Sequence, residues 1–257
     1  MAGPDAYAAT RTDGVLRVRR PGTEWLSTGW NGGRQESDCV YNVSVPEGWD
    51  RVDIAAYVPE RLERAGFEGD GPALLTGVDL EHARGARCGP VTVYATAGVS
   101  NPAGLPMEPA GGTLPGGGLE GGDGDEADDH GTAPVGTVNL LVGTTRALEA
   151  GALANLVAVA AEAKATTLFA TTGFPGTTTD AIVVGHDPTG PAASFSGSAT
   201  PVGAATRACV REALQAAVAS RYDGSATMPD TVSDAEYGVS TDVRAEVFRP
   251  RLEGNGR

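Results

Sequence analysis

The stretch that decides the fold runs from residue 136 to residue 185 and reads GTVNLLVGTTRALEAGALANLVAVAAEAKATTLFATTGFPGTTTDAIVVG. Its apolar runs and turn residues predict a buried strand over 135–144, a long helix over 148–164, and further strands over 166–170 and 181–185. The stretch contains Lys164, the only lysine of the chain, and Asp180, the one acid of its glycine- and threonine-rich turn. A polar turn at the mouth of an apolar strand is where a small-molecule site is expected.

The rest of the chain adds strands and two helices. Apolar or alternating segments predict strands over 15–19, 24–30, 39–45, 73–78 and 91–97, whereas residues 1–13 are expected to be a loose leader. Helical spacing predicts one helix over 53–65, ending before Gly66, and another over 200–222. The chain lacks both the regular strand–helix alternation with a glycine fingerprint and a P-loop. We therefore expect an α+β fold, a layered single domain over 14–222 with a mixed β-sheet covered by helices.

The segment 102–134 differs in composition from its surroundings. It is rich in glycine, has no lysine or arginine, and holds many acids: Glu108, Glu120, Asp123, Asp125, Glu126, Asp128 and Asp129. Such a segment buries too little apolar surface to offset its ordering entropy, so it is predicted to be a disordered acidic Gly-rich insertion. A calcium loop is disfavoured because the EF-hand spacing and its closing Glu are missing. Residues 223–257 are expected to be a polar, poorly ordered C-terminal tail.

The charge of the chain is strongly acidic, with 33 acids against 19 bases and a formal net charge of -14. This composition suits a salt-rich cytoplasm, where screening weakens self-repulsion. A GC-rich genome that encodes arginine in place of lysine would explain the scarcity of lysine but not the excess of acids. The lack of a basic patch argues against nucleic-acid binding. No segment is expected to span a membrane or act as a signal peptide, so a cytoplasmic protein is predicted.

The cysteines and histidines do not indicate a metal site. Cys39, Cys88 and Cys209 are widely spaced without a CxxC motif, and all three are expected to be small buried residues. The three histidines are equally scattered, and His186 is kept as a candidate because it is close to Asp180 in the sequence. The sequence therefore predicts no metal ligands.

Three polar turns follow predicted strands, at residues 27–33, 96–101 and 173–180. Backbone N–H groups that have left a strand ladder, together with Asn and Thr side chains, can bind carbonyl or amide groups of a ligand. Ordinary turn chemistry would also favour these residue types, so each turn taken alone indicates little.

The two charged residues of the long predicted helix do not form a local pair. Glu162 and Lys164 are two residues apart and point about 200° away from each other. Lys164 follows the apolar stripe of Leu153 and Val157, so it is either a partly desolvated base or cation, or a side chain that extends to water. Asp180 could act as a general base, orient a hydroxyl or cap its turn.

Taken together, these motifs resemble the adenosylcobinamide amidohydrolase family of corrinoid salvage. The matching stretches are STGWNGG (27–33) with residues 41–43, TAGVSNPAG (96–104), GTVNLLV (136–142), GALANLVAVAAEAKATTL (151–168), GTTTDAIVVG (176–185) and the turn 197–203. They occur in order over most of residues 14–222. The chain departs from the family pattern in the acidic insertion and at Pro201, where a polar or charged residue is expected.

The resemblance implies hydrolysis of the amide between a corrin propionate and aminopropanol, which gives adenosylcobyric acid and 1-aminopropan-2-ol. It also implies a cytoplasmic archaeal enzyme with a corrinoid as substrate rather than cofactor, and it leaves a homo-oligomer open. From their strand-end placement we expect Lys164 and Asp180 near the scissile amide, with Asn139 and Thr179 as donors and Glu162 in the catalytic set. The expected substrate-binding residues are Asn31, Gly32, Gly33, Asn42, Ser100, Asn101, Thr178 and Thr179. A non-catalytic corrinoid carrier and, less favoured, a metal-dependent amidase are the alternatives.

Overall fold

The computed structural model describes residues 6–46, 53–114, 136–224 and 226–250. Within these residues the main feature is one mixed eight-stranded sheet, with the order β4-β3-β2-β10-β8-β6-β5 and β1 paired to β2. Its strands are β1 (Ala8–Thr12), β2 (Val15–Ser27), β3 (Gly33–Ser44), β4 (Ala73–Thr76), β5 (Arg84–Cys88), β6 (Val91–Ala97), β8 (Val138–Thr144) and β10 (Ala181–His186). The α+β class and the mixed sheet agree with the sequence prediction.

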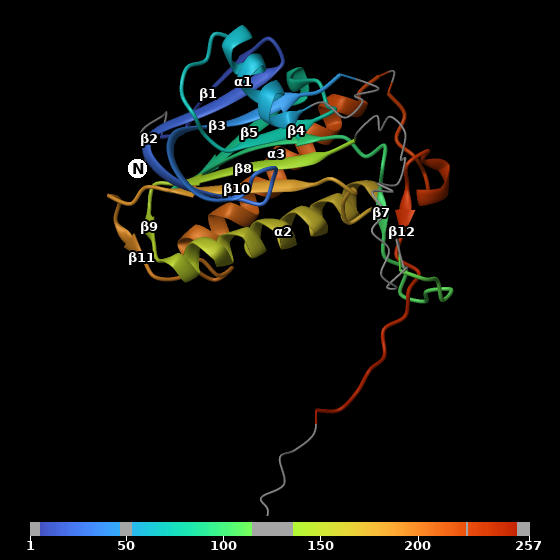
Figure 1. Cartoon of the computed structure of the whole chain (residues 1–257). Helices are drawn as coiled ribbons and strands as arrows, with labels where there is room; N and C mark the ends of the chain where they lie inside the picture. Colours follow the sequence, from blue (N-terminus) through green and yellow to red (C-terminus); the bar gives the residue numbers. More distant parts are fainter. Residues whose placement is uncertain (1–5, 47–52, 115–135, 225, 251–257) are drawn as a thin grey trace, which may run out of the picture.

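Helices cover the sheet on two sides (Figure 1). Helices α2 (Ala150–Thr172) and α3 (Pro201–Tyr222) lie on one side, and α1 (Ile54–Arg64) lies on the other. The side chains of β8 alternate between the two faces of the sheet. Leu140 and Val142 pack in the core with α2 and α3. The intervening Leu141 points to the opposite face of the sheet, where it belongs to a second core with Trp25 and Val40.

Short elements complete the structure. Two of them, β9 (Ala147–Leu148) and β11 (Ala192–Ala193), pair in parallel, and so do β7 (Ala103–Gly104) and β12 (Val239–Ser240). Two 3₁₀ helices, η1 (Leu80–His82) and η2 (Val232–Asp234), lie between larger elements. Helix α3 begins at Pro201, and the hydroxyl of Thr200 accepts the N–H of Gly203. Proline is favoured in the first turn of a helix, which gives Pro201 a structural reason.

Helix α2 is longer than predicted and replaces the strand expected over 166–170. The hydroxyls of Thr167, Thr171 and Thr172 donate to the carbonyl oxygens four residues earlier, which satisfies these side chains within the helix. The helix ends at Gly173, whose φ of +80° is the left-handed conformation that glycine favours. Short apolar runs do not distinguish strand from helix by themselves, which explains the error.

By length and composition, α2 could also cross a membrane, although no such segment is expected from the sequence. Half of the apolar window concerned is buried inside the protein, where it packs against the sheet and α3. The core helix of a soluble protein passes the same test, so this is weak evidence for a membrane.

The N-terminal region is more regular than predicted. Residues 8–12, expected in a loose leader, form β1, which pairs with β2 in antiparallel fashion. The segments predicted as two strands over 15–19 and 24–30 form the single strand β2, with a register shift between Arg19 and Thr23. Strand β5 was not predicted, and Cys88 at its end is exposed rather than buried, because β5 lies at the sheet edge.

The predicted insertion and tail are ordered where they meet. Residues 103–104 of the insertion form β7, and residues 239–240 of the tail form β12, which pairs with it. Backbone hydrogen bonds between these distant segments offset part of the ordering cost that the local composition predicts. Residues 115–135 and 251–257, for which disorder is also predicted, lie outside the described residues.

Candidate active site

The candidate site lies where four strand ends meet. Strand β10 runs parallel to β8 and antiparallel to β2, and β8 runs antiparallel to β6. The beginnings of β8 and β10 therefore lie at the same edge as the ends of β2 and β6. Three of the loops at this edge are the polar turns that the sequence singled out, at 27–33, 96–101 and 173–180.

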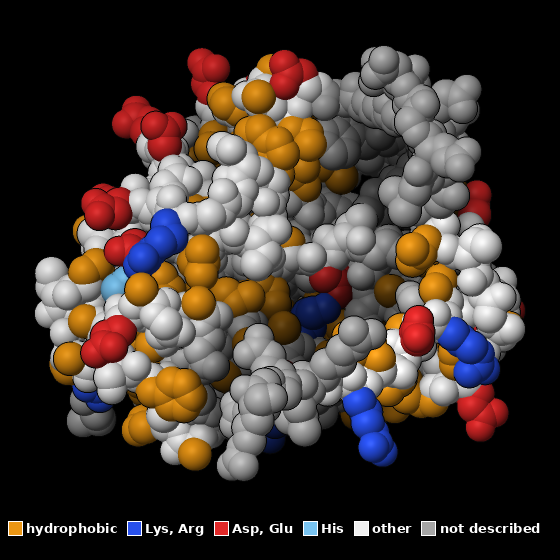
Figure 2. Space-filling model, turned by 60° about the horizontal axis from the view of Figure 1, so that its bottom comes forward, with side chains coloured by type: hydrophobic (Ala, Val, Ile, Leu, Met, Phe, Trp, Pro, Cys, Tyr) orange, Lys and Arg blue, Asp and Glu red, His pale blue; other side chains and the backbone are white. Residues whose placement is uncertain are grey.

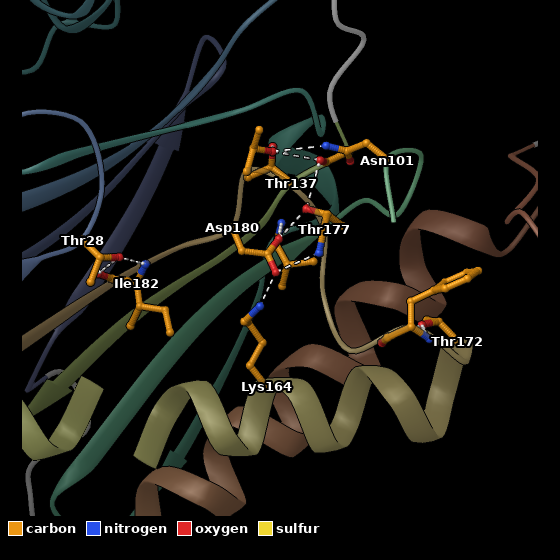
Figure 3. A network of polar contacts seen from close by, with 12 residues as sticks. Thr28, Asn101, Thr137, Lys164, Thr172, Thr177, Asp180 and Ile182 are labelled. Carbon is orange, nitrogen blue, oxygen red and sulfur yellow. Dashed lines mark hydrogen bonds and ion pairs between the residues drawn. The ribbon is translucent and has the colours of Figure 1, made fainter. Parts of the chain in front are cut away.

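Lys164 and Asp180 form an ion pair at this edge (Figure 3). Lys164 extends from α2 and donates to Oδ2 of Asp180, and each side chain is 11% exposed. Oδ2 also accepts the N–H of Thr177 at 3.0 Å. Oδ1 accepts the N–H of Val138 at 2.9 Å and the hydroxyl of Thr177. A carboxylate has about four acceptor sites, and all of them are occupied here. Asp180 is thus built to hold Lys164 in place.

Gly176 makes room for this pair. A Cβ atom at this position would lie 2.7 Å from Oδ2 of Asp180 and 3.1 Å from Nζ of Lys164. Any larger residue would therefore push the carboxylate or the ammonium aside. The glycine of this turn is required for the close approach of the two charges.

Hydroxyl and amide groups surround the pair. Nδ2 of Asn101 donates to the hydroxyl of Thr178 at 2.7 Å, and the hydroxyls of Thr137 and Thr179 are 2.9 Å apart. Thr178 and Thr179 are exposed, whereas Asn101 is only 3% exposed. Oδ1 of Asn101 has no hydrogen-bond partner among the described residues. Most buried acceptors have a partner, so the Oδ1 atom of Asn101 is free to accept a hydrogen bond from a bound molecule.

A cavity of about 430 Å³ opens beside Asp180. Its lining combines apolar side chains with threonines and Asp180: Thr28, Gly29, Trp30, Val45, Leu74, Leu75, Thr76, Gly77, Thr137, Thr179, Asp180 and Ala181. Figure 2 shows a hollow on one face of the molecule, with an acidic and a basic side chain next to each other and hydrophobic side chains around them. Such a lining suits a largely apolar ligand that carries a few polar groups.

The end of β2 is fixed to the start of β10 next to this cavity. The N–H of Thr28 donates to the carbonyl of Ile182 at 3.0 Å, and the N–H of Ile182 donates to the hydroxyl of Thr28 at the same distance. Residues 31–33 follow in an exposed turn in which Asn31 has a φ of +50°. Asn31, Gly32 and Gly33 are thus near the cavity but do not line it.

Two predicted residues are buried inside the sheet instead of facing a ligand. Asn42 and Asn139 are both fully buried. Nδ2 of Asn139 donates to Oδ1 of Asn42 at 2.9 Å and to the carbonyl of Leu75 at 2.8 Å, and Nδ2 of Asn42 donates to the hydroxyl of Thr96 at 3.0 Å. These amides connect β3, β4, β6 and β8, so they hold the sheet together beneath the site.

Other predicted residues lie apart from the Lys164–Asp180 pair. Glu162 is exposed on α2 and faces Arg207 of α3 at 3.5 Å, as its helical position relative to Lys164 requires. Ser100 accepts the N–H of Gly136 at 2.7 Å and thereby holds the backbone next to Thr137. His186 ends the strand that Asp180 precedes, so the two are separated by the length of β10 and His186 does not belong to the site.

Several residues that hold Asp180 or line the cavity were not among the predicted ones. Thr177 supplies two of the four contacts to Asp180, and its spacing three residues before an acid in a polar turn is a signal that could have identified it. Leu74 and Gly77 come from the end of an ordinary apolar strand, and nothing local marks them. Only the folding of β4 over the start of β8 brings them to the cavity.

Known proteins are similar in sequence to much of this chain. The chain matches the model of the adenosylcobinamide amidohydrolase family over residues 2–226. It is 58% identical over 246 residues to a Halobacterium salinarum protein named adenosylcobinamide amidohydrolase. The aligned region covers 95% of this chain and 100% of the relative. A Methanosarcina mazei protein of the same name is 27% identical over 165 residues, covering 64% of this chain and 70% of the relative. The matched region includes every residue of the candidate site.

Proposed function

The chain belongs to the adenosylcobinamide amidohydrolase family, and we propose that it hydrolyses its substrate at the cavity lined by Asp180, the carboxylate that holds Lys164. In this reaction water adds to the carbonyl carbon of the amide that joins a corrin propionate to aminopropanol. The carbon–nitrogen bond then breaks and the amine leaves with a proton. The products are adenosylcobyric acid and 1-aminopropan-2-ol, and the acid can be rebuilt into a cobamide.

The observation that supports this proposal best is the position of the only lysine. A lysine ammonium has three N–H donors, and Asp180 accepts one of them. The others can donate to the amide oxygen as negative charge develops on it. A cation held in a mostly buried site stabilises such charge more strongly than it would in water. Asp180 is a positioning residue in this scheme, since its four acceptor sites are filled.

The exposed threonines complete the proposed site. Thr179 lines the cavity, and its hydroxyl can bind the substrate amide or the attacking water. Asn101 and Thr137 hold Thr178 and Thr179 through the hydrogen bonds described above. We assign the exposed turn of Asn31, Gly32 and Gly33 to contacts with the amide side chains of the corrin rim.

We also propose that the reaction needs no resident metal or cofactor. Lys164 supplies the positive charge that a metal ion supplies in metal-dependent amidases. A chelator should therefore leave the rate unchanged. The acidic composition and the close relative from Halobacterium salinarum support a salt-adapted archaeal enzyme that acts in the cytoplasm.

The decisive experiment replaces Lys164→Met and, as a matched control on the same helix, Glu162→Gln. Purified protein is incubated with adenosylcobinamide in high salt, and released 1-aminopropan-2-ol is measured. Loss of one charge-stabilising donor typically lowers kcat by about 10²–10³-fold, so we expect that loss for Lys164→Met. Glu162→Gln should retain full activity, because this side chain is exposed on the other side of α2.

Because Lys164→Met leaves Asp180 unpaired, thermal unfolding should be measured for each variant, and the double variant Lys164→Met/Asp180→Asn should be included. Full activity in a folded double variant would contradict the assignment of the site. Corrinoid binding by the wild-type chain without any release of amine would favour the carrier function instead.

A further inference from the structure

A second cavity of about 790 Å³ lies next to the first one, between the β2–β3 turn and α1. Its inner surface includes the buried side chains of Leu62 and Phe67, and Trp30, Asn31 and Gln35 contribute from the turn side. This volume is in the range of cavities that bind small organic ligands. Except for Trp30, the residues that line this cavity do not line the first one.

Trp30 is the residue that the two cavities share. Its side chain is 39% exposed, which is high for a large aromatic ring in a turn fixed on both sides. Before it, a Cβ atom at Gly29 would lie 2.4 Å from the side chain of Leu74, so the turn packs directly on β4. After it, Gly32 fits closely against the carbonyls of Ser27 and Gly29. The turn therefore holds the indole of Trp30 at the boundary of both cavities.

The charges of the residues that line the second cavity indicate which kind of ligand it can bind. It contains the exposed acids Glu63, Glu68 and Asp70, and none of its lining residues, all in the described part of the chain, is lysine or arginine. A flat aromatic group can stack on Trp30, and amino or hydroxyl donors can bind the carboxylates. A phosphate would be repelled by the same acids. The cavity thus suits a purine nucleoside without a phosphate.

We infer that this second cavity binds the adenosyl group on the upper face of the corrinoid, with the adenine stacked on Trp30. The inference rests on the proposed function, because it takes adenosylcobinamide as the substrate. In a corrinoid the axial ligand leaves the face of the ring, whereas the amide chain leaves its rim. Two separate cavities that share the exposed indole of Trp30 match that arrangement, because the amide chain can enter the first cavity while the adenosyl group enters the second.

The test compares adenosylcobinamide with cyano-cobinamide, which has the same scissile amide but no adenosyl group. Stacking of a base on an aromatic side chain contributes about 1–3 kcal/mol, which corresponds to about 5- to 150-fold in affinity. Because Trp30 also lines the first cavity, Trp30→Ala should raise KM for both cobinamides, and we expect the rise for adenosylcobinamide to be at least about fivefold larger than the rise for cyano-cobinamide. Trp30→Phe should restore most of the affinity.

A binding measurement makes the test independent of hydrolysis. In equilibrium dialysis, 5′-deoxyadenosine should bind the wild-type chain saturably, whereas adenosine 5′-monophosphate should bind at least about tenfold more weakly because of the carboxylates. The charge-reversed variant Glu68→Lys should narrow that difference, since Glu68 is exposed at the cavity and its replacement removes no core contact.

Equal losses for both cobinamides in Trp30→Ala would overturn the inference, and so would the absence of 5′-deoxyadenosine binding. A wild-type chain that binds 5′-deoxyadenosine but releases no amine from either cobinamide would contradict the proposed hydrolysis while supporting the nucleoside cavity. The two proposals can therefore fail separately.

Discussion

Lys164 stands out at the scale of single residues, because every other basic residue of the chain is an arginine. The residues around Lys164 explain why an arginine side chain would not fit at this position. The ammonium lies against Gly176, where even one added methyl group would come within 3.1 Å of Nζ. A compact point charge fits such a space, whereas a planar guanidinium needs more width and a second acceptor. The residue choice thus follows from the geometry of the turn.

His186 gives a prediction for the pH dependence of stability. It is buried, its Nδ1 accepts the N–H of Leu148 at 2.9 Å, and its Nε2 lies 3.7 Å from Glu24, which itself pairs with Arg34. Burial lowers the pKa of His186, although Glu24 partly opposes this effect. The unfolded chain, with a histidine pKa of about 6.5, therefore binds more protons than the folded chain below that pH.

The stabilising contribution of a neutral His186 should accordingly be complete above about pH 6.5 and decline as the pH falls towards the lower pKa of the folded state. Denaturant unfolding between about pH 5 and 7.5 measures it, with His186→Asn as the comparison because its side chain can still accept the N–H of Leu148. The slope of unfolding free energy against pH should be smaller in the variant. Identical slopes would contradict the prediction.

Titration of the neighbouring Asp187 does not contribute to the pH dependence of the unfolding free energy in this range. Burial opposes ionisation of this carboxyl, but hydrogen bonds from Thr189 and Arg20 lower its pKa below the usual value. Its contribution to stability is therefore present above the unfolded carboxyl pKa of about 3.9 and is lost only as the pH falls below it. The two groups act in separate pH ranges.

At the scale of elements, the C-terminal segment is connected to the candidate site through β7. The N–H of Val239 donates to the carbonyl of Pro102 at 2.9 Å, and the N–H of Ala103 donates to the carbonyl of Gly176 at 3.0 Å. The N–H of Thr178 in turn donates to the carbonyl of Asn101 at 3.2 Å. Strands β12 and β7 therefore support the loop that carries Asp180, far from it in the sequence.

We predict that Val239→Pro lowers kcat by roughly tenfold, because misplacement of reacting groups by even a fraction of an ångström is costly. Proline removes the N–H that binds Pro102. Thermal unfolding should change little, since Val239 is exposed and outside the main core. Ala245→Pro is the control, because Ala245 is exposed in the irregular part of the same segment. Equal rates in both variants and the wild type would show that the segment does not support the site.

At the scale of the whole molecule, the net charge of -14 dominates. Like charges on one compact surface repel each other, and salt shortens the range of that repulsion from about 10 Å at 0.1 M to about 3 Å at 1 M. The folded state concentrates the acids more than the unfolded chain does. Salt should therefore stabilise the fold rather than merely improve solubility.

We predict that the Tm rises by at least about 5 °C between 0.1 and 2 M KCl, which corresponds to roughly 1–2 kcal/mol for a chain of this size. The comparison is a triple variant, Glu36→Gln/Glu60→Gln/Glu246→Gln, whose three side chains are exposed and outside both cavities. Its Tm at low salt should be higher and its salt dependence smaller. A Tm that falls with KCl in the wild type would refute the argument.

Much of the fold could be predicted because the decisive signals are local. The helix α1 follows the predicted bounds closely, with Asp53 as its cap and Gly66 just beyond its end. The apolar runs that form β6, β8 and β10 were also predicted, since buried strands produce continuous hydrophobic segments. The end of α2 was mispredicted because a run of threonines suggests a strand unless the hydroxyls bond within the helix.

The sequence by itself determined the α+β class, the acidic composition, the family and the polar turns that follow the strands, and it singled out Lys164 and Asp180. Tertiary structure alone decided that Asn42 and Asn139 bind each other inside the sheet, that Glu162 faces Arg207, and that the C-terminal segment supports the site. It also decided that Trp30 separates two cavities. The physical reason is that periodicity fixes which side of an element is buried, whereas the partner it meets there depends on contacts between segments far apart in the chain.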